Sequence, residues 1–425
     1  MSGFISGFIS FIRSAEMLLG LVAFIGLILQ RKSLSKVLTG TVKTIVGVLI
    51  LFAGAGLMVQ VLEKLTPMVY QVFGQEGLMP MTAVLLQKGM EIMGGTISGV
   101  FLGGFLVNII IARFTRWKYI MLAGNQMLWI SVVLPLVVAP AGLVGIPSII
   151  VCSIIAGIIY IYVAAITQPY TKIITGGQPV AVGHMGGTGY ALAGWLGKKL
   201  GDPSKSTESI KISDKLDFLK DNVLMTALVI FFIFTLFSLL AGGKVLHEKL
   251  GIEQPWLVFS LFQGLSFAAG LAVILYGVRM MLAEIVPAFH GVAEKLIPNA
   301  IPALDVPIIY PFMPNAVVIG FIASLLGGAL ATFVIRFSGG LFVVPPVMEH
   351  FFMGGAAGVF GNATGGRRGA VIGGIINGIF FTVLPVMLWQ YTSVMVPEAV
   401  TAVDTDVCLW GSLVGAIARL IHSIF

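Results

Sequence analysis

The sequence predicts an all-α polytopic membrane protein. Its 425 residues are 58% hydrophobic and only 10% charged, and the mean hydropathy is +1.03. A chain of this composition cannot form the polar surface that a water-soluble protein needs. The apolar residues also come in long continuous runs, whereas the strands of a membrane β-barrel alternate apolar and polar side chains. These observations predict membrane-spanning helices and exclude a barrel.

Apolar runs long enough to cross a bilayer occur along the whole chain. Most of them approach or exceed the ~20 residues that a helix needs to span the hydrocarbon core. Shorter runs at 15–30 and 407–425 bring the expected number to about 11 transmembrane helices. The first run leads into Arg31 and Lys32 without a small-residue cleavage site, which indicates a retained helix and not a signal peptide. The longer runs are 44–62, 119–143, 146–167, 223–241, 256–278, 316–335 and 370–388.

The net charge is +7, from 25 basic and 18 acidic residues. In a membrane protein this excess is typical of the positive-inside bias, so we interpret it as topology and not as nucleic-acid binding. The basic segments 31–43, 113–118 and 198–220 are therefore expected in the cytoplasm, with the N-terminus outside. The third is the only long polar interval in the chain, and we interpret it as a docking surface for a soluble partner.

This polar interval divides a single unit, 1–425, into the halves 1–197 and 221–425, joined by the cytoplasmic connection 198–220. Many transporters consist of two weakly similar halves of opposite orientation. Here each half has a charged amphipathic segment, an apolar span ending in arginine, and a Gly-Asn pair, in the same order. We therefore expect two inverted repeats; the alternative is chance recurrence in a chain with 53 glycines. The corresponding features are 31–45 and 279–297, Arg113 and Arg336, and Gly124-Asn125 and Gly361-Asn362.

One carboxylate stands in an apolar segment that contains several prolines. Asp305 is followed by Pro307, Pro311 and Pro314. Proline removes a backbone donor and breaks helices, and irregular backbone at membrane depth is tolerated only where protein or water satisfies it. We therefore expect a re-entrant or broken element that lines a polar cavity, where Asp305 accepts hydrogen bonds from the hydroxyls of a substrate. The alternative is that Asp305 only caps the following helix.

No catalytic, cofactor-binding or metal-binding residue is predicted. Cys152 and Cys408 both lie in apolar runs and are interpreted as small buried residues. The sequence also contains no Walker A motif, no HExxH and no Gly-x-Ser-x-Gly, which excludes the best-known ATP-driven, zinc-protease and hydrolase chemistries.

Three segments resemble a known family in the same order along the chain. They are "YGVRMMLAEIVPAFHGVAEKLIPNAIPALDVPIIYPFMPNAVVIGF" at 276–321, "VGH" at 182–184 and "GVFGNATGGRRGA" at 358–370. Together with the early "RKSLSKVLTGTVKTIVGVLILFAGAG", they resemble the ascorbate-specific IIC membrane component of the bacterial phosphotransferase system. The resemblance extends over nearly the whole chain.

The resemblance implies a homodimeric, multi-pass permease of the bacterial inner membrane. A soluble IIB phospho-carrier, itself served by a IIA protein, would phosphorylate the sugar or sugar acid that the permease delivers. The family fold implies a scaffold domain that holds the dimer and a core domain that carries substrate, with re-entrant hairpins and an elevator-type movement.

His184 lies among glycines, where backbone can approach a ligand closely, although a lone buried histidine is also often structural. The resemblance to the family at Gly183-His184 favours contact with the ligand. The residues expected to bind substrate are Asp305, His184, Asn125, Thr96, Gly183, Tyr310, Asn315, Gly361 and Asn362.

Several polar positions of ascorbate transporters are replaced in this chain. Ascorbate members have a histidine and a glutamine where this sequence has Asn125 and Trp129, and glutamines where it has Met185-Gly186. Loss of hydrogen-bonding partners favours a ligand that is less polar than ascorbate or differently shaped. A different class also stays open, an ion-coupled secondary transporter in which Asp305 is the proton or ion site.

Overall fold

The computed structural model describes residues 15–74, 77–210, 221–242 and 245–424. In this described part of the chain, eight helices have the length and hydropathy of a membrane span. The strands are only two to four residues long. The protein is therefore a polytopic all-α membrane protein, as its composition predicts. The spans are Thr82–Phe114, Gly124–Ala141, Gly145–Thr175, Val223–Ala241, Trp256–Gly277, Pro314–Phe337, His350–Thr392 and Thr405–Ile424.

About 11 transmembrane helices were expected, and the eight spans are those found among the described residues. The first apolar run forms α2 (Ala15–Leu29), whose 15 residues give a length of about 22 Å, shorter than the ~30 Å hydrocarbon core. The run at 44–62 has no helix of its own, because it continues without interruption from the charged segment before it and both belong to α3 (Leu34–Phe73).

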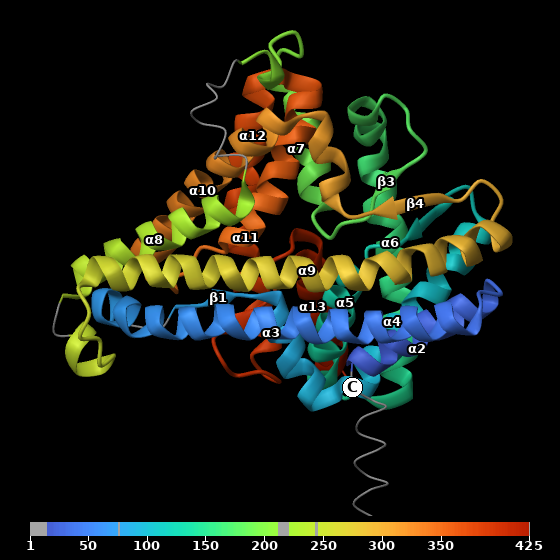
Figure 1. The fold of residues 1–425 in the computed structure, drawn as a ribbon, viewed down its shortest axis with the longest axis horizontal. Coiled ribbons are helices and arrows are strands. Elements are labelled where there is room, and N and C mark those ends of the chain that lie inside the picture. Colours follow the sequence, from blue (N-terminus) through green and yellow to red (C-terminus); the bar gives the residue numbers. More distant parts are fainter. Residues whose placement is uncertain (1–14, 75–76, 211–220, 243–244, 425) are drawn as a thin grey trace, which may run out of the picture.

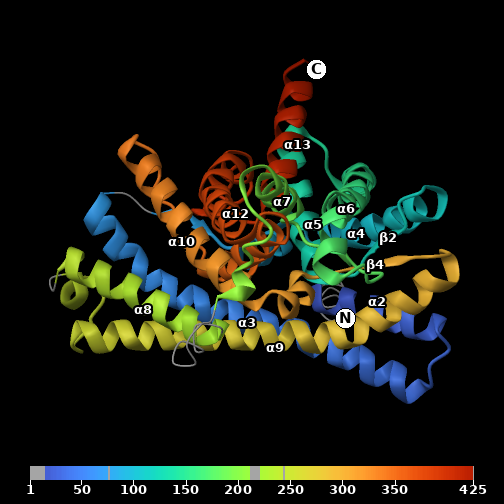
Figure 2. The same cartoon turned by 90° about the horizontal axis from the view of Figure 1, so that it is seen from above.

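Two helices of nearly equal length run side by side across the molecule, as Figures 1 and 2 show. α3 has 40 residues and α9 (Trp256–Leu296) has 41, so each is about 60 Å long. In both, an amphipathic segment and an apolar span form one continuous helix. An ion pair joins them, with 3.1 Å between Lys43 Nζ and Glu284 Oε1. α8 (Asn222–Ala241) packs along the same pair.

A second group of helices stands at a steep angle to α3 and α9 (Figure 1). α12 (Gly355–Thr392) packs against α10 (Pro314–Phe337) and α7 (Gly187–Leu200) through small residues. A Cβ atom on Gly320 would lie 2.6 Å from the Cα of Gly358, so only glycine permits this approach. α12 bends at Gly366, whose φ of 58° and ψ of −149° lie outside the helical region. It is preceded by α11 (Val347–Glu349) and a π-turn, η6 (His350–Gly354).

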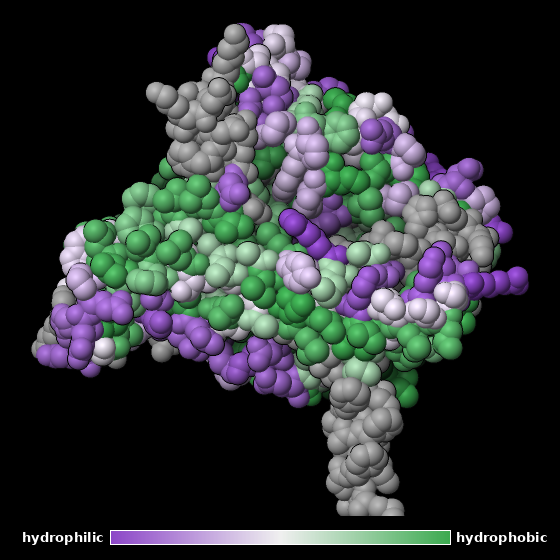
Figure 3. All heavy atoms as spheres, in the orientation of Figure 1, coloured by the Kyte–Doolittle hydropathy of each residue, from purple (hydrophilic) through white to green (hydrophobic). Residues whose placement is uncertain are grey.

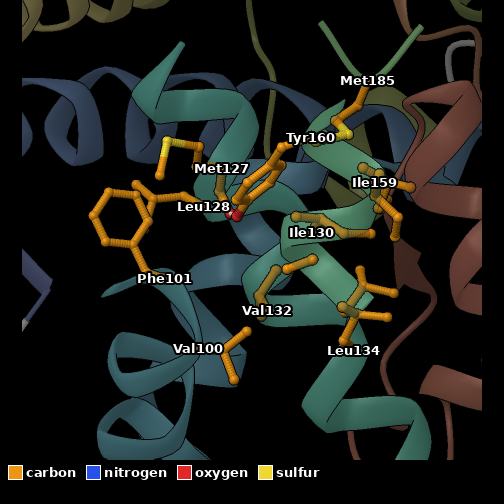
Figure 4. Close-up of a cluster of buried hydrophobic side chains, with 14 of the residues drawn as sticks. Val100, Phe101, Met127, Leu128, Ile130, Val132, Leu134, Ile159, Tyr160 and Met185 are labelled. Atoms are coloured by element: carbon orange, nitrogen blue, oxygen red, sulfur yellow. Dashed lines mark hydrogen bonds between the residues drawn. The ribbon is translucent and has the colours of Figure 1, made fainter. Parts of the chain in front are cut away.

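A third group surrounds α5 (Gly124–Val138), which is buried along almost its whole length. α4 (Thr82–Phe114), α6 (Gly145–Thr175) and α13 (Thr405–Ile424) pack around it. Figure 4 shows α5 side chains meeting Phe101 of α4 and Tyr160 of α6. This apolar packing positions the start of α5, which carries residues of the candidate site.

The remaining short turns are η1 (Ala139–Ala141), η2 (Thr207–Ser209) and η4 (Val245–Lys249).

The outer surface agrees with a bilayer environment. Large apolar side chains are exposed on α8 and α9, for example Leu239 at 57% and Phe262 at 55%. Figure 3 shows apolar residues over much of this face and hydrophilic residues gathered towards its edges. Exposed apolar area of this extent is typical of a surface that contacts lipid.

The short strands cross between the two halves of the chain. β4 (Ile301–Leu304) lies between β2 (Tyr119–Met121) and β3 (Ala181–Val182), all parallel. β1 (Met79–Pro80) pairs with β5 (Val400–Thr401), and Leu78 beside it forms a bridge with Val343. β4, which follows α9 in the second half, is thus flanked by two strands of the first half. β1 and Leu78, which follow α3 in the first half, pair with segments of the second half. This arrangement brings the residues that follow β3 and β4 together.

Candidate functional site

Asp305 lies directly after β4, at the start of a 3-10 turn, η5 (Val306–Phe312). Its Oδ1 atom accepts a hydrogen bond from its neighbour, Val306 N, at 2.8 Å. Strand, 3-10 turn and α10 follow one another within fourteen residues, from Ile301 to Pro314. This confirms that the proline-containing segment is broken, and Asp305 does cap the following turn. Its side chain is 22% exposed, so capping does not occupy the whole carboxylate.

Asn125 approaches Asp305 from the start of α5. Its Nδ2 atom donates to Asp305 Oδ2 at 3.1 Å, across 180 positions of sequence. The other end of the amide, Oδ1, is buried and has no hydrogen-bond partner. A buried acceptor without a partner is costly, which is why such atoms are usually satisfied by protein, water or ligand. Asn125 therefore holds the carboxylate with one atom and presents a free acceptor with another.

His184 approaches the same carboxylate from the segment after β3. Its Nε2 atom lies 3.7 Å from Asp305 Oδ1, longer than a hydrogen bond, and its Nδ1 atom is 3.0 Å from the hydroxyl of Tyr190. Burial lowers the pKa of His184 to about 4, although the Asp305 carboxylate opposes this shift. The imidazole is therefore neutral at pH 7, and the contact with Asp305 is not an ion pair.

The glycines beside His184 permit close approach of the backbone. Gly183 N donates to Leu304 O at 2.7 Å. A Cβ atom on Gly183 would lie 2.6 Å from Ala303 O, so a larger residue would push His184 away from β4. On the far side of His184, Met185 N donates to the side-chain oxygen of Gln126 at 2.9 Å. Gln126 follows Asn125, so one turn of α5 contacts both Asp305 and the His184 segment.

A further carboxylate, Asp404, is buried next to this cluster. Its Oδ2 atom accepts a hydrogen bond from Thr82 Oγ1 at 3.0 Å. Burial raises the pKa of Asp404 to about 7, and the negative charge of Asp305 raises it further while Thr82 lowers it. Two carboxylates whose charges interact in a buried setting favour one of them being protonated near neutral pH.

Two further residues that were expected to bind substrate, Tyr310 and Thr96, lie in or near interrupted helical segments. The Tyr310 hydroxyl, within η5, donates to Phe352 O at 2.6 Å and so joins η5 to η6. Thr96 is partly buried on α4, three residues after the helix bends at Met93 (φ −143°, ψ 39°). A role for Thr96 and Tyr310 in binding stays a prediction.

Asn315 and Asn362, in contrast, contact the segment 206–210. Asn362 Oδ1 accepts from Thr207 N at 2.9 Å, and Asn315 Nδ2 donates to Thr207 O at 3.2 Å. Glu208 closes this network, because its carboxylate accepts from Asn315 N and Ala316 N at the start of α10. We name residues 206–210 the anchored segment. Among the expected binding residues, these two asparagines hold the first part of the connection 198–220 in place.

Gly361 belongs to the bend of α12. A Cβ atom at this position would lie 2.1 Å from Gly369 O, so the glycine permits the two arms of the bent helix to meet. The rest of the connection, 211–220, lies outside the described residues, and so does part of the predicted docking surface.

Four further neighbours of the cluster were not predicted from the sequence: Gln126, Tyr190, Asp404 and Asp406. A usable signal was present in "VDTDV" at 403–407, where two carboxylates stand in an otherwise apolar stretch. Ionisable residues in such a position are usually functional or paired with a partner.

The amide of Asn125 and the imidazole of His184, from two separate segments, therefore converge on the carboxylate of Asp305 in a third. Such groups bind hydroxyls well, since the carboxylate accepts, the amide does both, and the neutral imidazole has one donor and one acceptor. No group of three or more His, Cys, Asp or Glu side chains suited to a metal ion occurs in the residues that the structure describes.

Comparison with known proteins identifies a family and a relative. The family EIIC-GAT, described as the PTS system sugar-specific permease component, matches residues 10–406. The chain is also similar to the ascorbate-specific PTS system EIIC component of Mycoplasma pneumoniae (strain ATCC 29342 / M129 / Subtype 1), with 26% identity over 426 residues. The match covers 85% of this chain and 63% of that relative, so the chain spans less than two thirds of the relative's length.

Proposed function

This chain belongs to the EIIC-GAT family of sugar-specific permease components of the phosphotransferase system, and on that premise we propose that it carries an ascorbate-like sugar or sugar acid across the inner membrane. In this proposal, a IIB phospho-carrier, supplied by a IIA protein, phosphorylates the substrate on the cytoplasmic side. The curated relative is named for ascorbate.

The observation that carries the proposal is the convergence of Asn125 and His184 on Asp305. All three lie at the ends of short strands or at a helix start, where the backbone is interrupted within an apolar protein. Broken elements inside a membrane protein are expected where a polar cavity or ligand satisfies the backbone. We therefore assign substrate binding to Asp305, Asn125 and His184, with Gly183 permitting their approach.

We also propose that the halves 1–197 and 221–425 are inverted repeats. The crosswise strands support this, because β4 lies between two first-half strands while β1 and Leu78 lie between β5 and Val343. Each half would donate its central strand to the other. In this scheme α2, α3, α8 and α9 form the scaffold, and the remaining spans form a core domain that moves as an elevator.

A homodimer is the proposed assembly. The long helices of the scaffold expose apolar side chains along much of their length, which suits contact with lipid and with a second copy. The mass of the protein in mild detergent and in nanodiscs tests this, because a monomer under both conditions would contradict it.

A transport assay tests the proposed function. The purified protein is reconstituted in proteoliposomes with radiolabelled L-ascorbate outside, and phosphoenolpyruvate and the general and IIA/IIB phospho-carriers inside. We expect ascorbate phosphate to accumulate only when the phospho-carriers are present. Uptake that needs no phospho-carrier and is abolished by a protonophore would support the ion-coupled alternative instead.

A further inference from the structure

Asp406 links the second half of the chain to the segment that carries His184. It lies in the first turn of α13 and is fully buried. Its backbone N donates to Met185 O at 2.7 Å. Its carboxylate accepts from Thr188 N at 3.0 Å and also from the Thr188 hydroxyl. One residue therefore contacts both ends of the segment 185–188, which directly follows His184.

The segment 185–188 has one local backbone restraint, the hydrogen bond from Gly187 N to His184 O at 3.1 Å. It contains Gly186 and Gly187, and glycine loses more conformational freedom on folding than any other residue. Further restraint comes from other segments of the chain. Gln126 accepts from Met185 N on one side, and Asp406 contacts Met185 and Thr188 on the other. Hydrogen bonds to a carboxylate are also stronger than neutral ones.

Asp406 also acts on α7 (Gly187–Leu200), the helix that carries Tyr190. Thr188 is the second residue of α7, where the backbone N–H has no partner within the helix. Asp406, 218 positions away in sequence, supplies that partner as a side-chain cap would. Tyr190, one half-turn further on, then contacts His184 Nδ1 at 3.0 Å. His184 is thus held through Met185, the next residue in the chain, and through the side chain of Tyr190.

We propose that Asp406 is a positioning residue for His184. It does not touch the proposed substrate; it fixes the segment 185–188 and the start of α7 so that the imidazole faces Asp305. The proposal rests on the proposed substrate site at Asp305 and His184. It adds Asp406, a residue of the second half of the chain, which affects binding only through His184.

A double-mutant cycle tests this inference. Binding of radiolabelled L-ascorbate is measured for purified protein in nanodiscs, with Asp406→Ala made in the native chain and in a His184→Gln background. Loss of hydrogen bonds to a charged group predicts affinity about ten-fold weaker in the native background. In the His184→Gln background we expect a change under about two-fold, because the residue that Asp406 positions is already gone. An equal loss in both backgrounds would overturn the inference.

A second measurement does not depend on the ligand. Diethyl pyrocarbonate modifies neutral histidine, and mass spectrometry gives the rate separately for His184 and for His350, which is equally enclosed, at 4% and 0% exposure. Asp406→Ala should speed modification of His184 about five-fold or more, as local opening becomes easier, and leave His350 unchanged. Unchanged labelling of His184 overturns the inference.

Two further variants separate the possible outcomes. Glu208→Gln is the matched control, since this carboxylate accepts from the backbone at the start of α10 and not from the segment 185–188, and it should leave His184 labelling unchanged. Asp406→Asn keeps the volume and one acceptor, and it replaces Asp406→Ala if that variant does not fold. If Asp305→Asn and His184→Gln bind normally while Asp406→Ala still exposes His184, the proposed substrate site is wrong and the positioning role stands.

Discussion

Asn125 and Asp305 are hydrogen-bonded across 180 residues of sequence, with 3.1 Å between Nδ2 and Oδ2. The contact joins the start of α5 to the end of β4. It therefore ties α5, the most buried of the spans that the structure describes, to the carboxylate in the proline-containing segment. The unpartnered Asn125 Oδ1 atom beside it gives the pair an acceptor that a hydroxyl can use.

Replacing Asn125 tests the value of this pair. Asn125→Ala removes the donor to Asp305 and the free acceptor together, and we expect L-ascorbate binding to weaken by about ten-fold. Asn125→Asp keeps the size but places a second carboxylate against Asp305, so binding should weaken further at neutral pH and partly recover when the pH is lowered. Equal affinity in both variants and the native protein would remove Asn125 from the site.

The anchored segment gives a contrasting prediction. Asn362→Ala breaks the bond to Thr207 N, and Glu208→Gln weakens the carboxylate cap on Asn315 and Ala316. Each should lower the free energy of unfolding by about 1–2 kcal/mol. We expect faster proteolysis within 200–210 but unchanged L-ascorbate affinity. A selective loss of affinity in Asn362→Ala would instead support its role in substrate binding.

Asp404 predicts a pH dependence of stability. Its pKa is raised from 3.8 to about 7 by burial, so the folded protein binds this proton more tightly than the unfolded chain. Its contribution to stability is therefore complete below pH 3.8 and is lost as the pH rises through about 7. The pKa of His184 is lowered from 6.5 to about 4, which gives the opposite trend between these pH values, because the unfolded chain binds a proton that the folded protein does not. This contribution is common to the native protein and to a variant at Asp404.

We therefore expect the unfolding temperature of the native protein, relative to that of Asp404→Asn, to fall between about pH 4 and pH 7 and to level off above this range. Asparagine at position 404 cannot titrate, so the difference between the two proteins isolates the contribution of Asp404. The measurement is thermal unfolding in detergent over the pH series for both proteins. Identical slopes would mean that Asp404 does not titrate in this range.

The orientation of the protein in the membrane can be tested at Ser204, just before the anchored segment. Ser204 is exposed, and both native cysteines, Cys152 and Cys408, are buried. We expect the cysteine introduced by Ser204→Cys to react with a membrane-impermeant maleimide in inverted vesicles and not in intact cells, because its surroundings are basic. Labelling from outside intact cells would reverse the predicted orientation.

The fold was predictable where composition and local chemistry decide it. Long apolar runs indicated the spans, and the prolines after Asp305 indicated a broken element, because each depends only on nearby residues. The continuous α3 and α9 were not expected, since a change from charged to apolar residues does not by itself end a helix. The inverted arrangement was inferred from the order of features and is supported by strand pairing that no local pattern encodes.

The site was predictable in part for the same reason. Asp305 and His184 are unusual in their own surroundings, and both lie in the cluster. Asn315 and Asn362 looked similar in sequence, yet they bind the anchored segment, because their partners are 105 to 156 residues away. Asp406 acts on a segment 218 residues earlier, a relationship that appears only once the helices are packed.

The central claim is that Asp305 binds the substrate, and Asp305→Asn tests it most directly. Asparagine keeps the shape and can still cap Val306 N, so folding should change little. It removes the charge and one acceptor, so L-ascorbate affinity should fall by about ten- to a hundred-fold. Binding and thermal unfolding are measured together on purified native and variant protein. An unchanged affinity, or equal losses of affinity and stability, would contradict the claim and leave Asp305 as a structural cap.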